Sequence, residues 1–400
     1  MVASPFNTKA KLWLAGRKGI FKNIRAALKE NEKRIWIHAA SLGEFEQGRP
    51  VIEALKKGNA KLKIVLTFFS PSGYEIQKNY EFADYVFYLP IDTAGNAKKF
   101  INLIKPDFAV FIKYEFWFNY LNTLKKQNIP TYLISSIFRK DQVFFRSYGN
   151  WYRKMLKTFN WFFVQNEESK NLLQNLGYKN ITVSGDTRFD RVYQIATNAK
   201  TFPLIKKFVQ NQFTIVLGSS WKADEEILFD FINSDANKIK YIIAPHEIHE
   251  TNIQRLAGML KKKIVRYSKL DGNNAENADI LIIDNIGILS SVYQYGHVAY
   301  IGGGFGSGIH NILEAATFGL PTLFGPNYKK FQEAIDLIDL GGAFEVNGKA
   351  NATEILHKMY LDTKYYQSAS NICKKYIETK RGACETITNY LLKEVTNELT

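Results

Sequence analysis

The sequence has no uninterrupted run of 18 apolar residues, and its start lacks the apolar core of a secretory signal. We therefore expect no membrane-spanning helix in this chain. Cysteine is scarce as well: Cys373 and Cys384 lie close together near the end and match no metal-binding spacing. We expect both to be reduced thiols, which excludes a disulfide scaffold and favours a cytosolic location.

Short repeats, low-complexity tracts and the common RNA-binding signatures are also missing. What remains is the composition of a globular protein, with 46% hydrophobic and 23% charged residues. Because 400 residues exceed what one hydrophobic core usually supports, two domains are expected, of about 200 residues each.

The positive charge is confined to the first half of the chain. Residues 1–200 contain 32 Lys and Arg against 16 Asp and Glu, whereas residues 201–400 contain 21 against 22. Between Lys9 and Arg34 the basic residues alternate with aliphatic and aromatic ones at roughly helical spacing. Such a face suits an anionic membrane surface or a phosphorylated lipid. Nucleic acid and a merely solvated basic face are the alternatives.

Apolar runs alternate with helical patterns throughout the chain, which indicates parallel sheets with right-handed crossovers. The expected strands of a first sheet are 34–38, 63–69, 85–89, 108–112, 131–134 and 161–164. Those of a second sheet are 213–217, 240–244, 280–283, 298–301 and 322–324. A polar stretch, residues 197–203, is a plausible hinge between them. The simplest architecture is α/β with two Rossmann-like domains.

The stretch from Trp36 to Pro50 places one carboxylate, Glu44, on a small-residue turn directly after an apolar strand. Enzymes of the α/β class keep their chemistry at such positions. Ser41 and Glu44 also have the spacing of a capping box, in which each side chain satisfies a free N–H at a helix start. Residues from Glu44 to about Lys57 are expected to form this helix, and the pattern alone favours the capping interpretation.

A second motif follows the strand 298–301, where five glycines occur between Gly302 and Gly308 before a helix expected from about Asn311. Glycines let backbone N–H groups approach a phosphate, and a helix N-terminus favours an anion. Glu314 is placed to accept hydrogen bonds from a ribose diol. The spacing is not the dinucleotide fingerprint. A tight connection whose glycines serve packing alone is the other interpretation.

With both motifs in view, the chain resembles the Kdo transferases of lipopolysaccharide biosynthesis. These enzymes move 3-deoxy-D-manno-oct-2-ulosonic acid (Kdo) from CMP-Kdo onto the lipid A precursor. The resemblance covers nearly the whole chain. It is carried by the stretches 11–17, 38–44, 184–190, 218–226, 284–289, 302–305 and 310–314.

The resemblance implies a GT-B glycosyltransferase, in which two parallel sheets face a central cleft. Residues 1–200 would bind the acceptor and the membrane, and residues 201–400 would bind CMP-Kdo, with C-terminal helices that could cross back to the first domain. It further implies inversion at the anomeric carbon, no metal and no other cofactor. Glu44 is the implied general base.

The resemblance also assigns binding residues position by position. The donor residues are Ser219, Ser220, His246, Ile286, Gly287, Ile288, Gly303, Gly304, Asn311 and Glu314. The acceptor candidates are Ser41, Gly43, Arg17, Arg49, Lys113 and Arg139. Two donor loops depart from the family: Pro245-His246-Glu247 replaces Pro-Arg-His, and Ser219-Ser220-Trp221 replaces Ser-Thr-His. In the first domain, Ser135-Ser136-Ile137 stands where many members have Asn-Ala-Arg.

These features predict CMP-Kdo, a lipid A precursor and an anionic membrane as partners, and no nucleic acid. Many members begin with an apolar anchor helix; without one, this chain is expected to lie peripherally on the cytoplasmic face of the inner membrane. The nearest alternative is another GT-B transferase that uses a UDP-sugar or a CDP-polyol. An alternative from another class is a non-catalytic, basic lipid- or RNA-binding protein, suggested by an isoelectric point near 9.4.

Overall fold

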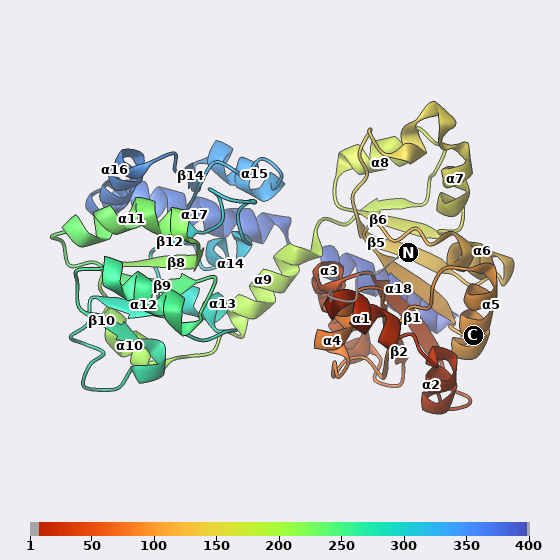
Figure 1. Cartoon of the computed structure of the whole chain (residues 1–400). Coiled ribbons are helices and arrows are strands. Elements are labelled where there is room, and N and C mark those ends of the chain that lie inside the picture. The colour runs from red at the N-terminus through yellow and green to blue at the C-terminus, as the bar shows by residue number, and fades with distance from the viewer. Residues whose placement is uncertain (1–7, 398–400) are drawn as a thin grey trace. The chain divides into compact units, whose positions relative to one another are not determined.

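The computed structural model describes residues 8–397 of the chain (Figure 1). Contacts divide it into two units. The first unit runs to Arg191 and resumes at Arg381, and the second comprises Val192–Lys380. The division falls between Arg191 and Val192, inside a helix, whereas the sequence suggested a boundary after residue 200. Among the residues described, no helix combines the length and apolar character needed to cross a bilayer.

The first unit contains a parallel sheet of seven strands in the order β3-β2-β1-β4-β5-β6-β7. Its strands are β1 (Arg34–Ala39), β2 (Lys63–Phe68), β3 (Tyr85–Tyr88), β4 (Phe108–Ile112), β5 (Thr131–Ser136), β6 (Trp161–Val164) and β7 (Ile181–Val183). Its helices are α1 (Thr8–Ala15), α2 (Ile20–Ala27), α3 (Leu42–Gly58), α4 (Pro71–Gln77), α5 (Ala94–Ile104), α6 (Phe118–Lys126), α7 (Asn150–Leu156), α8 (Glu167–Gln174) and α18 (Ala383–Asn397), with short 3₁₀ turns η1 (Val143–Phe145) and η2 (Ser147–Gly149).

The second unit repeats this architecture, with the strand order β10-β11-β9-β8-β12-β13-β14, all parallel. Its strands are β8 (Thr214–Ser220), β9 (Lys240–Pro245), β10 (Ile264–Arg266), β11 (Ile280–Ile282), β12 (Val298–Ile301), β13 (Thr322–Phe324) and β14 (Ala343–Glu345). Its helices are α10 (Pro203–Val209), α11 (Lys222–Ser234), α12 (Glu250–Met259), α13 (Leu289–Val292), α14 (Leu313–Ala316), α15 (Gln332–Leu340), α16 (Lys349–Leu361) and α17 (Thr363–Lys380), with turns η3 (Tyr267–Lys269) and η4 (Tyr293–Tyr295). Helix α9 (Thr187–Thr197) spans the division.

Alternation along the strands divides the core of the first unit into two layers, one on each face of the sheet. Trp36 and Phe111 belong to the layer that includes apolar residues of α2, α5 and α6. Ile37 and Val110, their neighbours in sequence, belong to the layer that includes residues of α3 and α18. Because both faces are covered, the strands are apolar throughout, as expected for buried parallel sheets.

The C-terminal helix α18 belongs to the first unit and packs against α3 (Figure 1). Ile387 and Leu391 are completely buried in the layer that also contains Leu55. The Asp190 carboxylate accepts hydrogen bonds from the N–H groups of Gly382, at 2.8 Å, and Cys384, at 3.0 Å. A carboxylate at a helix start satisfies otherwise free donors, so Asp190 fixes where α18 begins.

The predicted α/β architecture with two parallel sheets is confirmed, and every strand expected from the sequence is present. Three strands were not predicted: β7, β10 and β14. Each is three residues long and lies at the edge of its sheet. Most of their residues are only partly buried, so they lack the apolar run that marks the equally short interior strands β11 and β13.

Candidate functional site

The first candidate site lies where the strand order of the first sheet reverses. Strand β1 lies between β2 and β4, and the chain leaves β1 toward one face and β4 toward the other. In open α/β sheets, ligands bind outside the carboxyl ends of the strands at this point. Glu44 follows β1 in the first turn of α3, and Lys113 directly follows β4. The sheet therefore brings these two predicted residues to the same edge.

Ser41 and Glu44 do not form the capping box that their spacing suggests. Ser41 is the N-cap residue of α3, but its side chain accepts no hydrogen bond from the helix N–H groups. Its hydroxyl instead donates to the carboxylate of Glu44. Glu44 is half-buried. Ser41 thus binds one oxygen of the Glu44 carboxylate, and its hydroxyl does not cap the backbone N–H groups of α3.

Four charged side chains, one of them Glu44, act electrostatically on Lys113. Burial lowers the pKa of Lys113, the charges of Glu44 and Asp186 raise it, and those of Arg188 and Arg139 lower it. Lys113 has a left-handed backbone, with φ at 69°, which is uncommon for a residue with a side chain. Such conformations concentrate at functional sites. The cluster contains three cations and two carboxylates and suits an anionic ligand that carries a hydroxyl.

Tyr114 extends this cluster. Burial raises the pKa of its hydroxyl, and a hydrogen bond with Arg139 lowers it. The ammonium of Lys113 lies 5.4 Å from the centre of the Tyr114 ring, and the guanidinium of Arg139 lies 5.9 Å from it. The ring is therefore close to two cations that were predicted to contact the acceptor.

Asp186 and Arg188 were not predicted as site residues. The Arg188 side chain donates to the Asp186 carboxylate at 2.8 Å, and so does its backbone N–H, at 2.9 Å. Between them, the Thr187 hydroxyl bonds with that of Ser135 at 2.9 Å and donates to the carbonyl of Gln47. These bonds attach the segment to the end of β5 and to α3. Strand β7 was not predicted from the sequence, so Asp186 and Arg188 were not placed directly after a strand, where site residues are expected.

Two acceptor candidates are used structurally. Each of the three nitrogen atoms of the Arg17 side chain donates to a main-chain carbonyl, namely those of Leu89, Trp13 and Phe69, at 2.8–3.0 Å. Burial lowers the pKa of Arg17 to about 10. Arg49 donates to Glu53 at 2.8 Å and lies 3.6 Å from Glu46. Both guanidinium groups are thus committed to the fold of the first unit. Gly43 is exposed in the first turn of α3.

The second candidate site lies at the corresponding point of the second sheet, where β8 lies between β9 and β12. Asp224 is completely buried there. Its carboxylate accepts hydrogen bonds from the N–H groups of Trp221 and Gly303 and from the hydroxyl of Tyr300, each at 2.9 Å. A buried carboxylate is tolerated only with such partners. Asp224 therefore ties the Ser219–Trp221 loop to the glycine loop.

Three aromatic rings stack beside these loops. The rings of Trp221 and His246 are 4.2 Å apart and nearly parallel, and those of His246 and His310 are 4.8 Å apart. The indole N–H of Trp221 donates to Nε2 of His310 at 3.2 Å. Burial lowers the pKa of His310, and the neighbouring His246 lowers it further. Trp221 thus orients His310, whereas His246 is exposed.

The glycine loop is shaped by close contacts within the protein. A Cβ atom on Gly302 would lie 2.1 Å from the carbonyl oxygen of Ser219, and one on Gly304 would lie 2.5 Å from the nitrogen of Gly325. Gly303 has φ at 92°. The packing interpretation therefore explains these three glycines. The expected helix is present but short: α14 begins at Leu313, two residues after the expected start near Asn311, and has one turn. It is followed by Gly319, which adopts a left-handed conformation, and by Pro321. The helix-dipole argument for an anion is weakened accordingly.

Asn311 and Glu314 point toward one another. The Asn311 side-chain N–H donates to the Glu314 carboxylate at 3.1 Å, and its amide oxygen accepts the N–H of Leu313 at 3.1 Å. The hydroxyl of Tyr293, beneath them, is completely buried, and burial with the charge of Glu314 raises its pKa. A Cβ atom on Gly218 would collide with this hydroxyl. Glu314 is therefore fixed near the end of β8.

The segment Ile286–Ile288 follows β11 at the same edge of the sheet. Ile286 is 85% exposed and Gly287 has φ at 91°, so the turn projects an apolar side chain into solvent. Isoleucine at this exposure has no packing role in the described chain. It is available to contact a flat apolar surface such as a nucleobase. The remaining donor candidates, Ser219 and Ser220, end β8, and Ser219 has φ at 53°.

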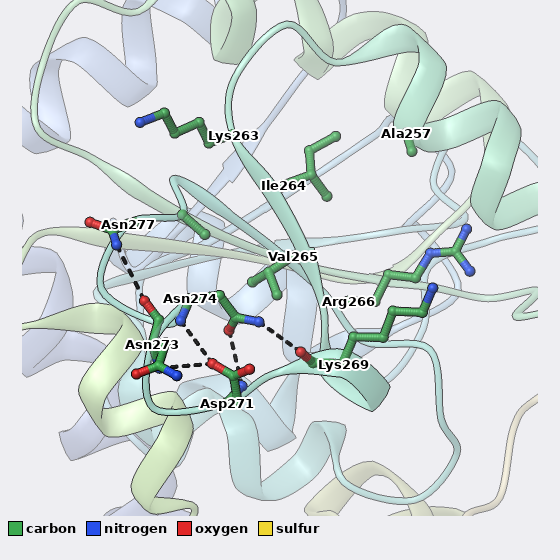
Figure 2. Close-up of a pocket in the computed structure, with 11 residues that line it drawn as sticks. Ala257, Lys263, Ile264, Val265, Arg266, Lys269, Asp271, Asn273, Asn274 and Asn277 are labelled. Atoms are coloured by element: carbon green, nitrogen blue, oxygen red, sulfur yellow. Dashed lines mark hydrogen bonds between the residues drawn. The ribbon is translucent and has the colours of Figure 1, made fainter.

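A pocket of about 680 Å³ lies elsewhere, along the edge strand β10 (Figure 2). Figure 2 shows that the side chains of Asn274 and Asn277 bond to nearby backbone atoms. Asp271 accepts the N–H groups of Asn273 and Asn274, and the side chains of Asn274 and Asn277 donate to carbonyls. It contains none of the predicted residues. Within residues 8–397, no group of three side chains is arranged to hold a metal ion.

Comparisons with known proteins agree with the two motifs. A family model described as 3-deoxy-D-manno-octulosonic-acid transferase matches residues 14–191. A 3-deoxy-D-manno-octulosonic acid transferase of Aquifex aeolicus is 28% identical over 343 residues, which are 84% of this chain and 87% of the relative. One of Haemophilus influenzae is 26% identical over 395 residues, 94% of this chain and 90% of the relative.

Among solved structures, a UDP-GlcNAc 2-epimerase of Neisseria meningitidis bound to UDP-GlcNAc matches with a TM-score of 0.63 and 19% identity. The match covers 90% of this chain and 100% of that one. At this identity the likeness concerns the fold alone, and it confirms the predicted GT-B class with its two parallel seven-stranded sheets.

Proposed function

Since this chain belongs to the family of 3-deoxy-D-manno-octulosonic-acid transferases, which are glycosyltransferases, we propose that it transfers Kdo from CMP-Kdo to a lipid A precursor. The observation that carries the proposal is the position of the two motifs. Glu44 and the Asp224-tied loops each lie at the strand-order reversal of a parallel sheet, where α/β proteins bind ligands. The relatives suggest which sugar is transferred, and the positions of the two motifs suggest which residues take part in the reaction.

Glu44 is the proposed general base. It takes the proton from the acceptor hydroxyl as that oxygen attacks the anomeric carbon of Kdo. The bond from this carbon to the phosphate oxygen breaks, and CMP leaves from the opposite face, so the configuration inverts. A positioned base contributes about 10²- to 10⁴-fold to such a step. The bond from Ser41 supports this role, because it orients the carboxylate without using its second oxygen.

CMP carries the developing negative charge, and donors fixed in advance stabilise such charge well. His246, which is exposed beside the glycine loop, is the proposed hydrogen-bond donor to the phosphate, in place of the family arginine. Ser219 is proposed to donate to the same phosphate, whereas the hydroxyl of Ser220 is buried and donates to Glu225 at 3.1 Å. Glu314 would accept from the ribose hydroxyls, and Ile286 would lie along the cytosine. No metal is assigned to this step.

The acceptor is proposed to bind at the charged cluster around Glu44. Lys113 and Arg139 would pair with the phosphates of a lipid A precursor, since Arg and Lys bind phosphate strongly, whereas Arg188 is held by Asp186. The basic first half would hold the chain peripherally at the cytoplasmic face of the inner membrane. Arg17 and Arg49 are left out of this assignment because their side chains bind other residues of the first unit.

Incubation with CMP-Kdo and a lipid A precursor, followed by mass spectrometry, tests the proposal. The expected product is heavier by one or more Kdo residues, and unchanged acceptor would contradict it. A thermal-shift series with CMP, UDP and CDP separates the alternatives, because a ligand stabilises the folded chain by RT ln(1 + [L]/Kd). Selective stabilisation by UDP would favour a different GT-B transferase. A chain that no nucleotide stabilises would favour a binding protein.

A further inference from the structure

A second pocket, of about 530 Å³, lies beside the glycine loop. Residues that follow three neighbouring strands line it: Gly306 and Ser307 after β12, Pro326, Asn327, Lys329 and Lys330 after β13, and Glu345 at the end of β14. In the strand order, β12 separates β13 and β14 from β8, β9 and β11. The pocket therefore lies on the far side of the glycine loop from Ser219, His246 and Ile286.

The wall of this pocket is built by Asn327. Its backbone N–H donates to the carbonyl of Gly304 at 2.9 Å, and its side-chain N–H donates to that of Gly306 at 2.8 Å. The side-chain oxygen of Asn327 takes part in neither bond and is available to accept a hydrogen bond from a ligand. The Glu345 carboxylate accepts from the hydroxyl of Tyr328 at 2.9 Å and retains further acceptor capacity. Together with the Ser307 hydroxyl, these groups suit a ligand with several hydroxyl groups.

The pocket also carries excess positive charge. Lys329 and Lys330 are exposed, and neither forms an ion pair with a carboxylate of residues 8–397. Glu345 is the acidic residue among the lining residues. Two ammonium groups without carboxylate partners attract an anion, and the hydroxyl-binding wall restricts which anion fits. The lining therefore suits a ligand that carries several hydroxyl groups and an acidic group.

We propose that this pocket binds the sugar of the nucleotide-sugar donor, and that Lys329 and Lys330 hold its carboxylate. The inference rests on the proposed function, since it takes Kdo, an eight-carbon hydroxylated acid, as the transferred group. With the phosphate at the glycine loop, the nucleoside lies toward β8, β9 and β11 and the sugar toward β13 and β14. The volume falls in the range of about 300–1,000 Å³ that is typical of small-molecule sites. A neutral sugar would leave both ammonium groups unused.

Steady-state kinetics of the full chain test this assignment with the double variant K329A/K330A. The expected KM for CMP-Kdo rises about tenfold, because charge-assisted hydrogen bonds to the carboxylate are lost. The inhibition constant of CMP, which has no sugar, stays within about twofold of the wild-type value. Lys238→Ala is the matched control: it removes an exposed lysine just before β9, at the amino end of that strand, whereas the pocket follows the carboxyl ends of β12, β13 and β14, and it should change neither constant.

An unchanged KM for CMP-Kdo in the double variant would overturn the assignment. So would an equal rise in both constants, because the lysines would then contact the nucleotide. The melting temperature should stay at the wild-type value, since both side chains are exposed and unpaired with described residues. Failure of the wild-type chain to use CMP-Kdo at all would instead contradict the proposed function, and the two failures are therefore distinguishable.

Discussion

The hydroxyl of Ser41 donates a hydrogen bond to the carboxylate of Glu44, so the two residues meet through their side chains and not through the helix backbone. This contact distinguishes two roles, helix capping and orientation of a carboxylate, which the spacing of the two residues in the sequence could not distinguish. A capping pair stabilises the helix, whereas a serine that orients a carboxylate serves the chemistry of that carboxylate. The first two predictions follow from this distinction.

Glu44→Gln is expected to reduce Kdo transfer by about 10²-fold or more, because an amide cannot accept the proton of the acceptor hydroxyl. Its melting temperature should stay close to that of the wild-type chain. Glu46→Gln, two residues along α3, removes a carboxylate that pairs with Arg49 and Arg191 at the surface, and should retain transfer. Product formation by mass spectrometry and thermal unfolding measure both effects. Full transfer by Glu44→Gln, or a collapse of its stability, would return Glu44 to a structural role.

Ser41→Ala should lower the transfer rate several-fold with little loss of stability, because Ser41 caps no helix N–H. Ser70→Ala is the matched comparison. Ser70 is an N-cap whose hydroxyl accepts the N–H of Ser72, and losing such a cap costs about 0.5–2 kcal/mol. Chemical denaturation of both variants distinguishes them. A larger loss of stability in Ser41→Ala than in Ser70→Ala would contradict the assigned roles.

Asp224→Asn is expected to destabilise the second unit by about 2–4 kcal/mol, because the new amide N–H would face donors in a buried site. Donor binding should weaken as well, since Asp224 ties the loops of Trp221 and Gly303 together. Asp230→Asn, which breaks an exposed pair with Lys349, should cost less than about 1 kcal/mol. Denaturant titration and CMP binding supply the two measurements. Equal stability losses in both variants would argue against the buried network.

The chain should lose stability on acidification below the ordinary histidine pKa, near 6.5. Burial lowers the pKa of His297, whose Nδ1 accepts the N–H of Thr214 at 3.1 Å and so must be unprotonated. The unfolded chain then binds more protons than the folded one, and stability falls as the pH falls. His297→Asn keeps an acceptor for Thr214 and should flatten the dependence of melting temperature on pH between 7 and about 5.5. His249→Asn, at an exposed histidine, is the control.

Binding to anionic vesicles should depend on aromatic residues that the sequence did not single out. In the aromatic stretch near Arg139, Phe138 and Phe144 are buried, whereas Tyr148 and Trp151 are 74% and 47% exposed. Trp151→Ser should weaken binding to vesicles that contain anionic lipid by several-fold, since exposed aromatics beside basic residues insert at the headgroup level. Sedimentation with anionic and neutral vesicles measures this. Binding that ignores lipid charge would contradict it.

The sequence predicted the elements with long apolar runs and failed where the signal was short. The central strands are buried on both faces, so their runs are continuous and were found at nearly their observed ends. Strand β7 has only three half-buried residues, and missing it hid Asp186 and Arg188. The glycines after β12 illustrate a second limit. A glycine forced by a neighbouring backbone, such as Gly302 against Ser219, has the same sequence signature as one that cradles phosphate.

Charge assignments from sequence failed for a similar reason. Arg17 and Lys113 are both basic residues of the first half, yet one binds three carbonyls and the other lies in the cluster around Glu44. Which partner a long side chain reaches depends on contacts between distant segments. The donor-site departures could be seen in the sequence, but the stacking of Trp221 on His246 required coordinates.

The hydrogen bonds from Gly382 and Cys384 to Asp190 bear on how the chain is made. Helix α18 completes the core layer around Leu55, so the core of the first unit is incomplete until the residues of α18 have been synthesised. The second unit, Val192–Lys380, is contiguous and can fold before α18 has packed onto the first unit. A chain truncated after residue 380 should therefore hold a folded second unit beside an unfinished first one, so the unit that begins first in the sequence is the last to be completed.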